Sequence, residues 1–423
     1  MKIRNLAATA GTIMVAALVL SGCSASGGDS NSTSDGELSG TLTGIFDSQY
    51  KAALEPIVAN FEKKYPDVDV QIDYQGGDLG PVILTQLQGG TAPDVLLSFP
   101  GGTEGTAADN VIPLAAGGLI APIEPDWAGD IPETWKSSFF HDDQLYAFPG
   151  AIQPLTAIYN KTMLDEFGLK APTTLDEVYA FCADASDHGV YAYAQGLGDT
   201  SAGPQMLSFA QTASLVYGPT PDWDAQLASG DVTYPKSGWE TQFEIYQKMF
   251  DAGCFGDGAL GRSRQQGQDA VAARQALGLV DVGAVTAGIQ KADTKDEFII
   301  TAMPATEDGK SYITSLPIYS LTVNAKAKNL AAAKAFVEFA GEPEQSALYA
   351  TGFNMVPLIP NDQFTPPAEL ADFAQLVNDG KTAMLANVTP EVQVALNTGV
   401  QSMLLGQDTP ASLAQKLQDA YGK

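Results

Sequence analysis

Two glycine-lysine segments of this sequence come nearest to a catalytic pattern, because they resemble the end of a phosphate-binding loop. They read DGKS at residues 308–311 and DGKT at residues 379–382. The motif, G-x-x-x-x-G-K-[ST], also needs an earlier glycine, five residues before the glycine of the Gly-Lys pair. Pro304 stands at that position in the first segment and Gln375 in the second. Neither segment therefore predicts a nucleotide site. A glycosidase needs only two carboxylates, so the 50 acidic residues leave that class of enzyme open.

The two histidines do not complete a hydrolase or a metal site. His141 and His188 lie in charged turn sequences, and no Gly-x-Ser-x-Gly motif supplies a serine nucleophile. Together with Cys182 and Cys254 they do not build a convincing zinc site. We therefore predict a protein that is not an enzyme and that holds no metal or other cofactor.

Cys23 follows a segment with the features of a secretion signal. A basic start precedes an apolar run at residues 6–20, which is too short for a stable membrane span. The Leu-Ser-Gly-Cys sequence that ends at Cys23 resembles a bacterial lipobox, which implies cleavage before Cys23 and lipidation of it, for example by palmitate. A chance cysteine beside an ordinary cleavage site is the alternative. We predict a signal peptide at 1–22 and a flexible, lipid-anchored linker at 23–37, which is rich in Gly, Ser, Asn and Asp.

Cys182 and Cys254 lie in the middle third of the chain. An exported protein folds in a compartment that permits disulfides. We expect these two cysteines to be paired, and two separate buried thiols are the alternative.

The composition is that of an acidic globular protein. The formal charge of −28 disfavours nucleic acid and anionic lipid headgroups as partners. About 400 residues remain after the signal, which is more than one hydrophobic core usually supports, so two lobes are expected.

Strand and helix patterns alternate along the first part of the chain. Residues 40–46 and 94–99 read as strands, and an amphipathic helix with Leu54, Ile57 and Phe61 on one face lies between them. This alternation predicts β-α-β units, whose sheets bind ligands at the carboxyl ends of their strands.

Later helices carry clear start signals. Thr174, with Glu177 three residues on, predicts a capping box. Thr409 and Pro410 predict the start of the closing helix.

Four segments, taken in their order along the chain, resemble a known family. They read FEKKYPDVDV, GGTAPDVLLS, DDQLYAFPGAIQPLTAIYNKTMLDEFGLKAPTTLDEV and AAAKAFVEFAGEPEQSALYATGFNMVP. The most specific is the strand that enters Tyr159, Asn160 and Lys161 and is followed by Gly168, Pro172 and a helix. The series resembles extracellular solute-binding protein family 1, the maltose-binding-protein-like sugar receptors of bacterial ABC importers.

This resemblance implies an α/β, two-lobe periplasmic-binding-protein-like fold of type II. Each lobe is expected to be a mainly parallel sheet flanked by helices, and hinge crossings join the lobes. The expected crossings lie near residues 149–153, 303–304 and 363–367. The expected boundaries are 38–149 plus 304–365 for lobe 1 and 150–303 plus 366–423 for lobe 2.

The same resemblance implies an extracellular substrate-binding lipoprotein that delivers a sugar or oligosaccharide to an ABC transporter. Ligand in the interlobe cleft favours the closed form over the open one, which lets the transporter distinguish loaded from empty receptor. The implied partners are the sugar, the permease subunits and the membrane through the lipid on Cys23, with no nucleic acid. We expect a monomer, lipid-anchored at the extracytoplasmic face of the cell membrane.

Sugars need hydrogen-bonding groups for their hydroxyls and aromatic faces for their C–H patches. The resemblance places such residues at strand ends and crossings. The candidate ligand-binding residues are Ser48, Gln49, Asp78, Ser98, Phe99, Gln153, Asp199, Thr200, Trp223, Trp239, Gly283, Tyr319 and Asn354.

Several candidates have an equally simple structural explanation. Ser48 is also explained as a helix cap, Asp78 as a solvated loop residue and each tryptophan as a core residue. The chain also departs from the family pattern, because Pro100 follows where relatives often carry a charge and no tryptophan follows Gly283. A polyamine or another non-sugar solute, and a secreted carbohydrate-active enzyme, remain alternatives to the sugar receptor.

Overall fold

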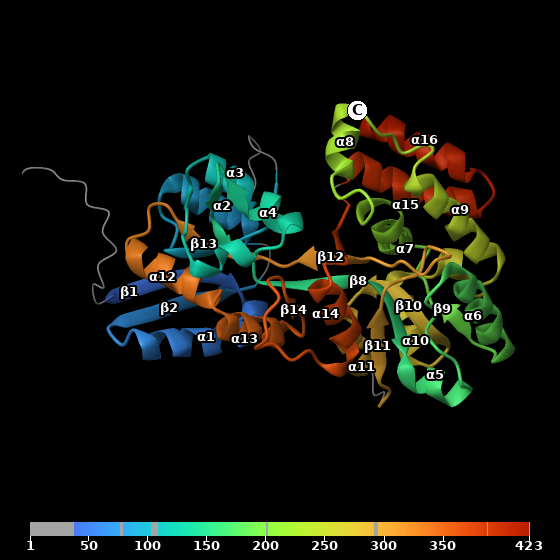
Figure 1. The fold of residues 1–423 in the computed structure, drawn as a ribbon, viewed down its shortest axis with the longest axis horizontal. Coiled ribbons are helices and arrows are strands. Elements are labelled where there is room, and N and C mark those ends of the chain that lie inside the picture. Colours follow the sequence, from blue (N-terminus) through green and yellow to red (C-terminus); the bar gives the residue numbers. More distant parts are fainter. Residues whose placement is uncertain are drawn as a thin grey trace, which may run out of the picture. The chain divides into compact units, whose positions relative to one another are not determined.

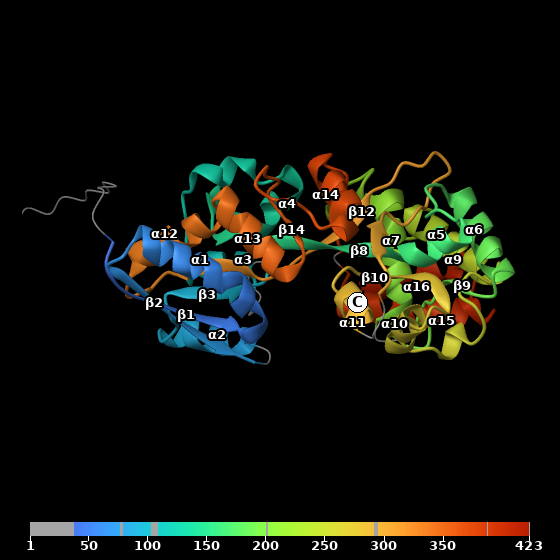
Figure 2. The same cartoon turned by 90° about the horizontal axis from the view of Figure 1, so that it is seen from below.

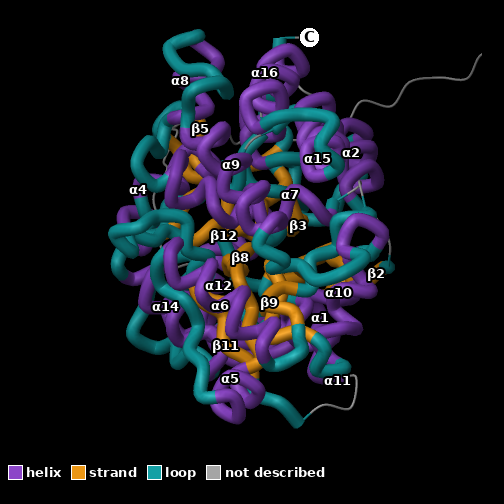
Figure 3. Tube along the Cα trace, turned by 90° about the vertical axis from the view of Figure 1, so that its right-hand side faces the viewer, coloured by secondary structure: helices purple, strands orange, loops and turns teal. Residues whose placement is uncertain are grey.

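A computed structural model describes residues 38–76, 79–102, 109–199, 202–291, 295–386 and 388–422. The predicted signal peptide and linker, with Cys23, lie outside the described residues, as do Asp78 and Thr200. From Leu38 onward the strands form a six-stranded sheet, a seven-stranded sheet and a small hairpin. Helices surround these strands (Figure 3), so the chain has the α/β fold class that the sequence predicts.

The six-stranded sheet is built mainly from the first part of the chain. Its order is β2-β1-β3-β13-β4, and β7 also pairs with β13. The strands are β1 (Gly40–Asp47), β2 (Val68–Gln75), β3 (Val95–Ser98), β4 (Ile120–Ala121), β7 (Ala147–Phe148) and β13 (Ser320–Asn324). The helices of this part are α1 (Lys51–Lys64), α2 (Gly80–Gly89), α3 (Val111–Ala116), α4 (Glu133–Phe139), α12 (Leu330–Ala340) and α13 (Pro343–Phe353).

Two helices from late in the sequence complete this part of the molecule. Figure 1 shows α12 and α13, in orange, beside the blue α1 and β1. The Phe61 ring of α1 lies 5.2 Å from the Phe336 ring and 5.5 Å from the Phe339 ring, both on α12. These buried aromatic contacts explain why the late segment returns to the first sheet.

The seven-stranded sheet has the order β15-β12-β8-β10-β9, and β11 and β14 also pair with β8. The strands are β8 (Ala151–Asn160), β9 (Tyr191–Tyr193), β10 (Ala276–Val282), β11 (Phe298–Thr301), β12 (Ile313–Pro317), β14 (Val356–Pro357) and β15 (Thr382–Met384). The helices of this part are α5 (Lys161–Phe167), α6 (Leu175–Asp187), α7 (Gly203–Thr212), α8 (Trp223–Ser229), α9 (Gly238–Asp251), α10 (Arg264–Ala272), α11 (Val285–Lys291), α14 (Ala371–Asn378), α15 (Pro390–Leu404) and α16 (Pro410–Tyr421). Figure 2 shows β10 among these helices.

Short elements connect the larger ones. The hairpin consists of β5 (Phe140–His141) and β6 (Gln144–Leu145). The short helical turns are η1 (Ser48–Tyr50), η2 (Asp126–Asp130), η3 (Ala213–Tyr217), η4 (Ala259–Gly261) and η5 (Ala368–Leu370). No helix within the described ranges is long and apolar enough to cross a membrane.

The predicted helix starts are confirmed. Thr174 and Glu177 form a reciprocal capping box at the start of α6. Thr409 caps α16, and Pro410 occupies its first turn. These boundaries depend on a few neighbouring residues, which is why the sequence alone predicts them.

The expectation of mainly parallel sheets is wrong for the strands that arrive from the other sheet. β1 pairs in parallel with β2 and β3, and β10 with β9, as β-α-β units require. In contrast, β13 runs antiparallel to β3, β4 and β7, and β8 runs antiparallel to β10, β11, β12 and β14. Both β8 and β13 enter directly from the other sheet, without the crossover helix that a parallel connection needs.

The strand pairing shows where the chain changes sheet. It leaves the first sheet between β7 and β8, at residues 149–150, within the expected first crossing. It returns between β12 and β13, at residues 318–319, and not near 303–304, because β11 and β12 both pair with β8. It leaves again between α13 and β14, which precedes the expected third crossing at 363–367.

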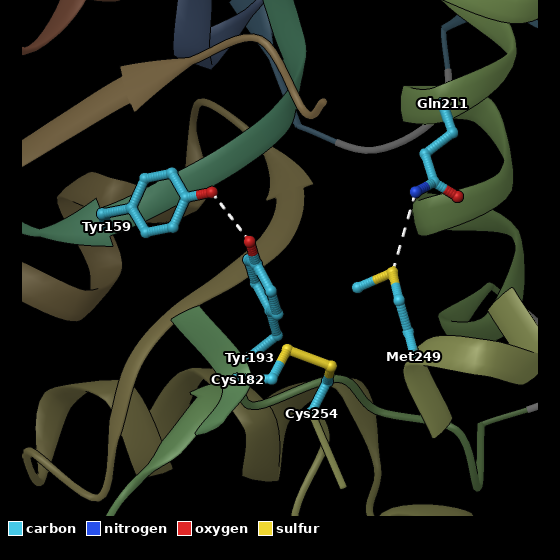
Figure 4. The surroundings of a disulfide bond; sticks show 6 residues. All are labelled: Tyr159, Cys182, Tyr193, Gln211, Met249 and Cys254. Carbon is cyan, nitrogen blue, oxygen red and sulfur yellow. Dashed lines mark hydrogen bonds between the residues drawn. A yellow bond between two sulfur atoms is a disulfide. The ribbon is translucent and has the colours of Figure 1, made fainter. Parts of the chain in front are cut away.

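The structure joins Cys182 and Cys254 in a disulfide, the pairing that the sequence analysis expects. Cys182 belongs to α6, and Cys254 follows α9. Both side chains are buried. Figure 4 shows the bond beside Tyr193, whose hydroxyl lies 2.9 Å from the hydroxyl of Tyr159 on β8. The disulfide thus fixes α6 to the loop that follows α9, next to the edge strand β9.

Candidate ligand-binding site

Polar groups from three neighbouring strands meet at one edge of the seven-stranded sheet. β9 and β10 are parallel and end at this edge, whereas the antiparallel β8 begins there. Gln153, near the start of β8, accepts a hydrogen bond at Oε1 from the backbone N–H of Ala284 at 3.4 Å. The backbone N–H of Gly283 donates to the carbonyl of Pro154 at 2.7 Å. The structure therefore brings together two of the predicted residues, Gln153 and Gly283.

Glycine suits position 283 because of its close approach to β8. A Cβ atom there would lie 3.0 Å from two atoms of the Pro154 ring, which is tighter than an ordinary contact. Gly283 thus contributes backbone, not a side-chain surface, to this edge of the sheet.

A charged pair that the sequence analysis missed lies at the same edge. Arg264 is the first residue of α10, and Asp281 is near the end of β10. The Arg264 Nε donates to Asp281 Oδ1 at 3.1 Å and Oδ2 at 2.8 Å, and Nη2 also donates to Oδ1. The Asp281 side chain is 1% exposed and that of Arg264 is 31% exposed. The pair therefore holds a partly open guanidinium over a buried carboxylate.

The sequence does contain a signal for this pair. Asp281 is the one charged residue of the apolar strand ALGLVDV at Ala276–Val282. A carboxylate in a buried strand needs a partner, because an unpaired buried charge is costly. The capping box of Ser263 and Gln266 starts α10 and so places Arg264 in its first turn. The partner is 17 residues away in sequence, which is why spacing alone did not identify it.

Asp199 adds a second carboxylate near the guanidinium. Asp199 follows β9, and its carbonyl accepts from the backbone N–H of Gly203 at the start of α7, at 2.8 Å. The hydrogen bond with Asp281 raises the pKa of Arg264 above its usual value, and the charge of Asp199 raises it further. Arg264 therefore stays protonated, with Asp281 as its hydrogen-bonded partner. Thr200, the other candidate here, lies outside the described residues.

An aromatic pair lies where β3 ends and β13 begins. The Phe99 and Tyr319 rings meet edge to face, with centroids 5.4 Å apart. Phe99 is 41% exposed, which is unusual for a large apolar side chain. The backbone of Tyr319 is fixed on both sides, since its N–H donates to Tyr50 Oη and its carbonyl accepts from Tyr349 Oη, each at 3.1 Å. Two predicted residues thus form one exposed aromatic surface at a chain crossing.

Ser98 is a correction, because the structure places its side chain inside the first sheet. The residue is 0% exposed, and its hydroxyl lies 2.8 Å from that of Thr322 on β13. β3 and β13 pair in register at this point, so the two hydroxyls satisfy each other. Ser98 supports the strand that ends at Phe99 and offers no exposed group.

The two tryptophans are also corrections. Trp239 is 0% exposed and Trp223 is 4% exposed. Both pack edge to face on Tyr234, with ring centroids 5.6 Å and 5.2 Å from it. α8 and α9 are amphipathic, and their apolar faces bury these rings in the core behind the second sheet. Neither ring has a free face for a sugar.

Three other candidates are exposed polar residues of helix ends. Ser48 and Gln49 follow β1 directly, and Asp47, not Ser48, is the cap, accepting from the Gln49 N–H at 2.9 Å. Asn354 ends α13 in the left-handed conformation with φ of 53°, and its side chain donates to Glu369 at 3.4 Å. Ser48 and Gln49 stay available to a ligand, whereas the position of Asn354 is explained by the helix end.

One cavity, of about 680 Å³, lies between α15 and α16. Gln153, Arg264 and Phe99 line neither this cavity nor four smaller ones among the described residues. Gln153 and Phe99 lie at strand ends of two different sheets. Within the same part of the chain, no cluster of three or more His, Cys, Asp or Glu could hold a metal.

Comparisons with known proteins identify the family of this chain. Residues 46–347 match the family described as bacterial extracellular solute-binding protein. A maltooligosaccharide ABC transporter solute-binding lipoprotein of Streptococcus pneumoniae R6 is 24% identical over 379 residues, which cover 84% of this chain and 81% of the relative. A galactooligosaccharide-binding protein of Bacillus subtilis is 22% identical, over 99% of this chain and 98% of the relative.

Solved structures share the fold. The ligand-free form of RafE from Streptococcus pneumoniae has a TM-score of 0.75 and 18% identity, covering 92% of this chain and 98% of its own. RafE in complex with raffinose has a TM-score of 0.69 and 17% identity, covering 90% of this chain and 99% of its own. At this identity the likeness concerns the fold alone.

Proposed function

This chain belongs to the bacterial extracellular solute-binding proteins, and on that basis we propose that it captures a sugar or oligosaccharide and delivers it to an ABC transporter permease. The observation that carries the proposal is the family match over residues 46–347, which includes strands of both sheets. Relatives along nearly the whole chain are named for oligosaccharides. A receptor releases its ligand unchanged, so no catalytic step is proposed.

The residues at the sheet edges suit a sugar. Gln153 offers an amide that can donate to and accept from hydroxyls. Phe99 and Tyr319 offer an exposed aromatic surface for the C–H face of a pyranose ring. Ser48 and Gln49 add exposed polar groups after β1. This mixture of a few directed polar groups and an aromatic platform is typical of small-ligand sites.

We assign one lobe to each sheet and place the ligand between them. The lobes divide where the chain changes sheet, at residues 149–150 and 318–319 and between α13 and β14. A ligand that contacts Gln153 on one sheet and Phe99 on the other stabilises only the arrangement in which both reach it. Binding therefore shifts the population toward a closed form, by as much as the ligand's differential affinity for the two forms.

The location follows from the N-terminus. We propose that a lipid on Cys23 anchors the mature protein to the outer face of the cell membrane and that residues 24–37 tether it. The Cys23→Ala variant, expressed in a bacterium that processes lipoproteins, should appear in the medium. The wild-type chain should fractionate with the membranes. A Cys23→Ala protein that stays in the membrane fraction contradicts the anchor and leaves the ligand proposal untouched.

Ligand binding is tested by a thermal-shift screen over mono- and oligosaccharides, polyamines and amino acids, followed by calorimetry. A ligand at 100 times its dissociation constant adds about 2.7 kcal/mol of stability. We expect a rise in melting temperature with an oligosaccharide, and chromatography should recover that sugar intact. A rise only with a polyamine or amino acid contradicts the sugar proposal, and turnover of the sugar contradicts the receptor proposal.

A further inference from the structure

We propose that Arg264 donates hydrogen bonds to the ligand and that the carboxylates around it make the site select neutral, hydroxyl-rich sugars over acidic sugars. The proposal rests on the proposed function, because it names the class of solute that the same site accepts. Its premise is position, since Arg264 lies at the sheet edge where Gln153 and Gly283 meet.

Asp281 fixes the orientation of the guanidinium. Two of the N–H groups of Arg264, those on Nε and Nη2, donate to the Asp281 carboxylate. Asp281 is held in turn, because its Oδ1 accepts from the Val282 N–H at 2.7 Å and its Oδ2 from Gln268 at 3.3 Å. A side chain held by a buried, fully bonded partner loses little further freedom when it binds a ligand.

The outer edge of the guanidinium remains available. A guanidinium carries five N–H donors. Two of them are engaged with Asp281, and no hydrogen bond from the other three to another described residue is seen. The side chain is 31% exposed, so this edge reaches solvent. Adjacent N–H groups in a fixed fork match pairs of neighbouring hydroxyls on a sugar ring.

The local charge argues against an acidic ligand. The hydrogen-bonded carboxylate of Asp281 cancels the charge of Arg264, and Asp199 follows Gly198, whose N–H donates to the carbonyl of Arg262 at 2.8 Å, just before Arg264. Arg262, the neighbouring cation, is held by the protein, because its guanidinium lies over the Tyr191 ring and donates to the carbonyls of Gln195, Phe255 and Asp257. The chain as a whole carries −28, which also repels anions.

A purely structural role for the pair is the competing explanation, and Arg274 provides its control. Arg274 follows α10 at the opposite end, before β10 begins, and its guanidinium pairs with Glu166 and lies 3.6 Å from Asp296. Its side chain is 40% exposed, close to the 31% of Arg264. The two arginines therefore have similar pairing and exposure but lie at opposite edges of one sheet.

The test compares wild type, Arg264→Lys and Arg274→Lys by calorimetry, with maltotriose, raffinose and xylotriose as neutral probes and trigalacturonate as the acidic probe. Lysine keeps the charge but replaces the fork with a single donor group. We expect wild type to bind at least one neutral probe at least tenfold more tightly than trigalacturonate. Arg264→Lys should bind that neutral probe at least fivefold more weakly than wild type. The affinity of Arg274→Lys for the same probe should stay within twofold of wild type.

Each other outcome has a distinct meaning. Equal affinity of wild type and Arg264→Lys for the neutral probe overturns the proposal while the sugar receptor stands. Trigalacturonate bound as tightly as the neutral probe overturns the claimed selectivity. Arg264→Lys can also lower the melting temperature, and Arg274→Lys then serves as the comparison. If Arg274→Lys is equally destabilised and loses the same affinity, the effect is structural and the proposal is overturned. Wild type that binds none of the sugars of the thermal-shift screen and does bind a polyamine or an amino acid contradicts the proposed function itself.

Discussion

Removal of the disulfide should destabilise the protein without abolishing the site. The double variant Cys182→Ala/Cys254→Ala deletes a bond between α6 and the loop after α9. The two cysteines are 72 residues apart in sequence. In the chain-entropy account, opening a loop of this length restores about 15 cal/mol/K to the unfolded chain, or about 4 kcal/mol at 25 °C. The free energy of unfolding should fall by about that amount.

The site should survive because other contacts hold the same loop. The N–H of Tyr193 donates to the Cys254 carbonyl at 3.0 Å, and the N–H of Gly198 donates to the Arg262 carbonyl at 2.8 Å. These bonds join β9 and the loop after it to the segment that leads from Cys254 into Arg264. We therefore expect the folded double variant to bind its ligand within threefold of wild type.

Urea unfolding followed by tryptophan fluorescence measures the change, since two of the four tryptophans, Trp223 and Trp239, lie in the core of the same part of the chain. Wild type with added reductant is the matched control, and reductant should not alter the double variant. A loss below about 1 kcal/mol refutes the reasoning from loop length. Mass spectrometry of unreduced wild type that finds two free thiols refutes the pairing.

Three further predictions concern single residues. Gln153→Ala should weaken ligand binding by about 1–3 kcal/mol, because a buried hydrogen bond to the ligand is lost. Calorimetry measures the change, with the exposed Gln415→Ala as control; equal affinities remove Gln153 from the site. Phe99→Ala should weaken binding while the melting temperature stays nearly unchanged, because the ring is 41% exposed; a large drop in melting temperature with unaltered affinity makes Phe99 a core residue instead. Asp94→Asn should make the free energy of unfolding depend less on pH below neutrality. Burial raises the pKa of Asp94, but hydrogen bonds from Thr43 and two backbone N–H groups outweigh it, so the pKa is lowered on folding. That stabilisation is present above the unfolded pKa of about 4 and is lost as the pH falls through the lowered folded pKa; urea unfolding at pH 7 and pH 3 that shows the same loss in wild type and Asp94→Asn contradicts the assignment.

The parts of the fold that depend on neighbouring residues could be predicted from the sequence. The capping box of Thr174 and the Thr409-Pro410 helix start are set within four residues. β1 and β3 follow from their apolar runs, and α1 from its period, because a buried face imposes that pattern locally.

The parts that depend on distant residues could not. β8 and β13 run antiparallel to their neighbours because the chain enters each of them directly from the other sheet. The residues of these strands carry no pattern that indicates this change of sheet. Trp239 suits a sugar by residue type alone, but partners that bury it, such as Phe209 on α7, come from a distant part of the chain. Arg264 was missed for the same reason, since only the pairing of α10 with β10 places it against Asp281.

The central claim is that the two proposed lobes close around a sugar. Small-angle X-ray scattering of the mature chain, with and without a saturating oligosaccharide from the screen, tests it most directly. We predict a smaller radius of gyration with the bound sugar and no change with a sugar that does not bind. A radius that stays the same at saturation, with binding verified by calorimetry on the same sample, contradicts the claim.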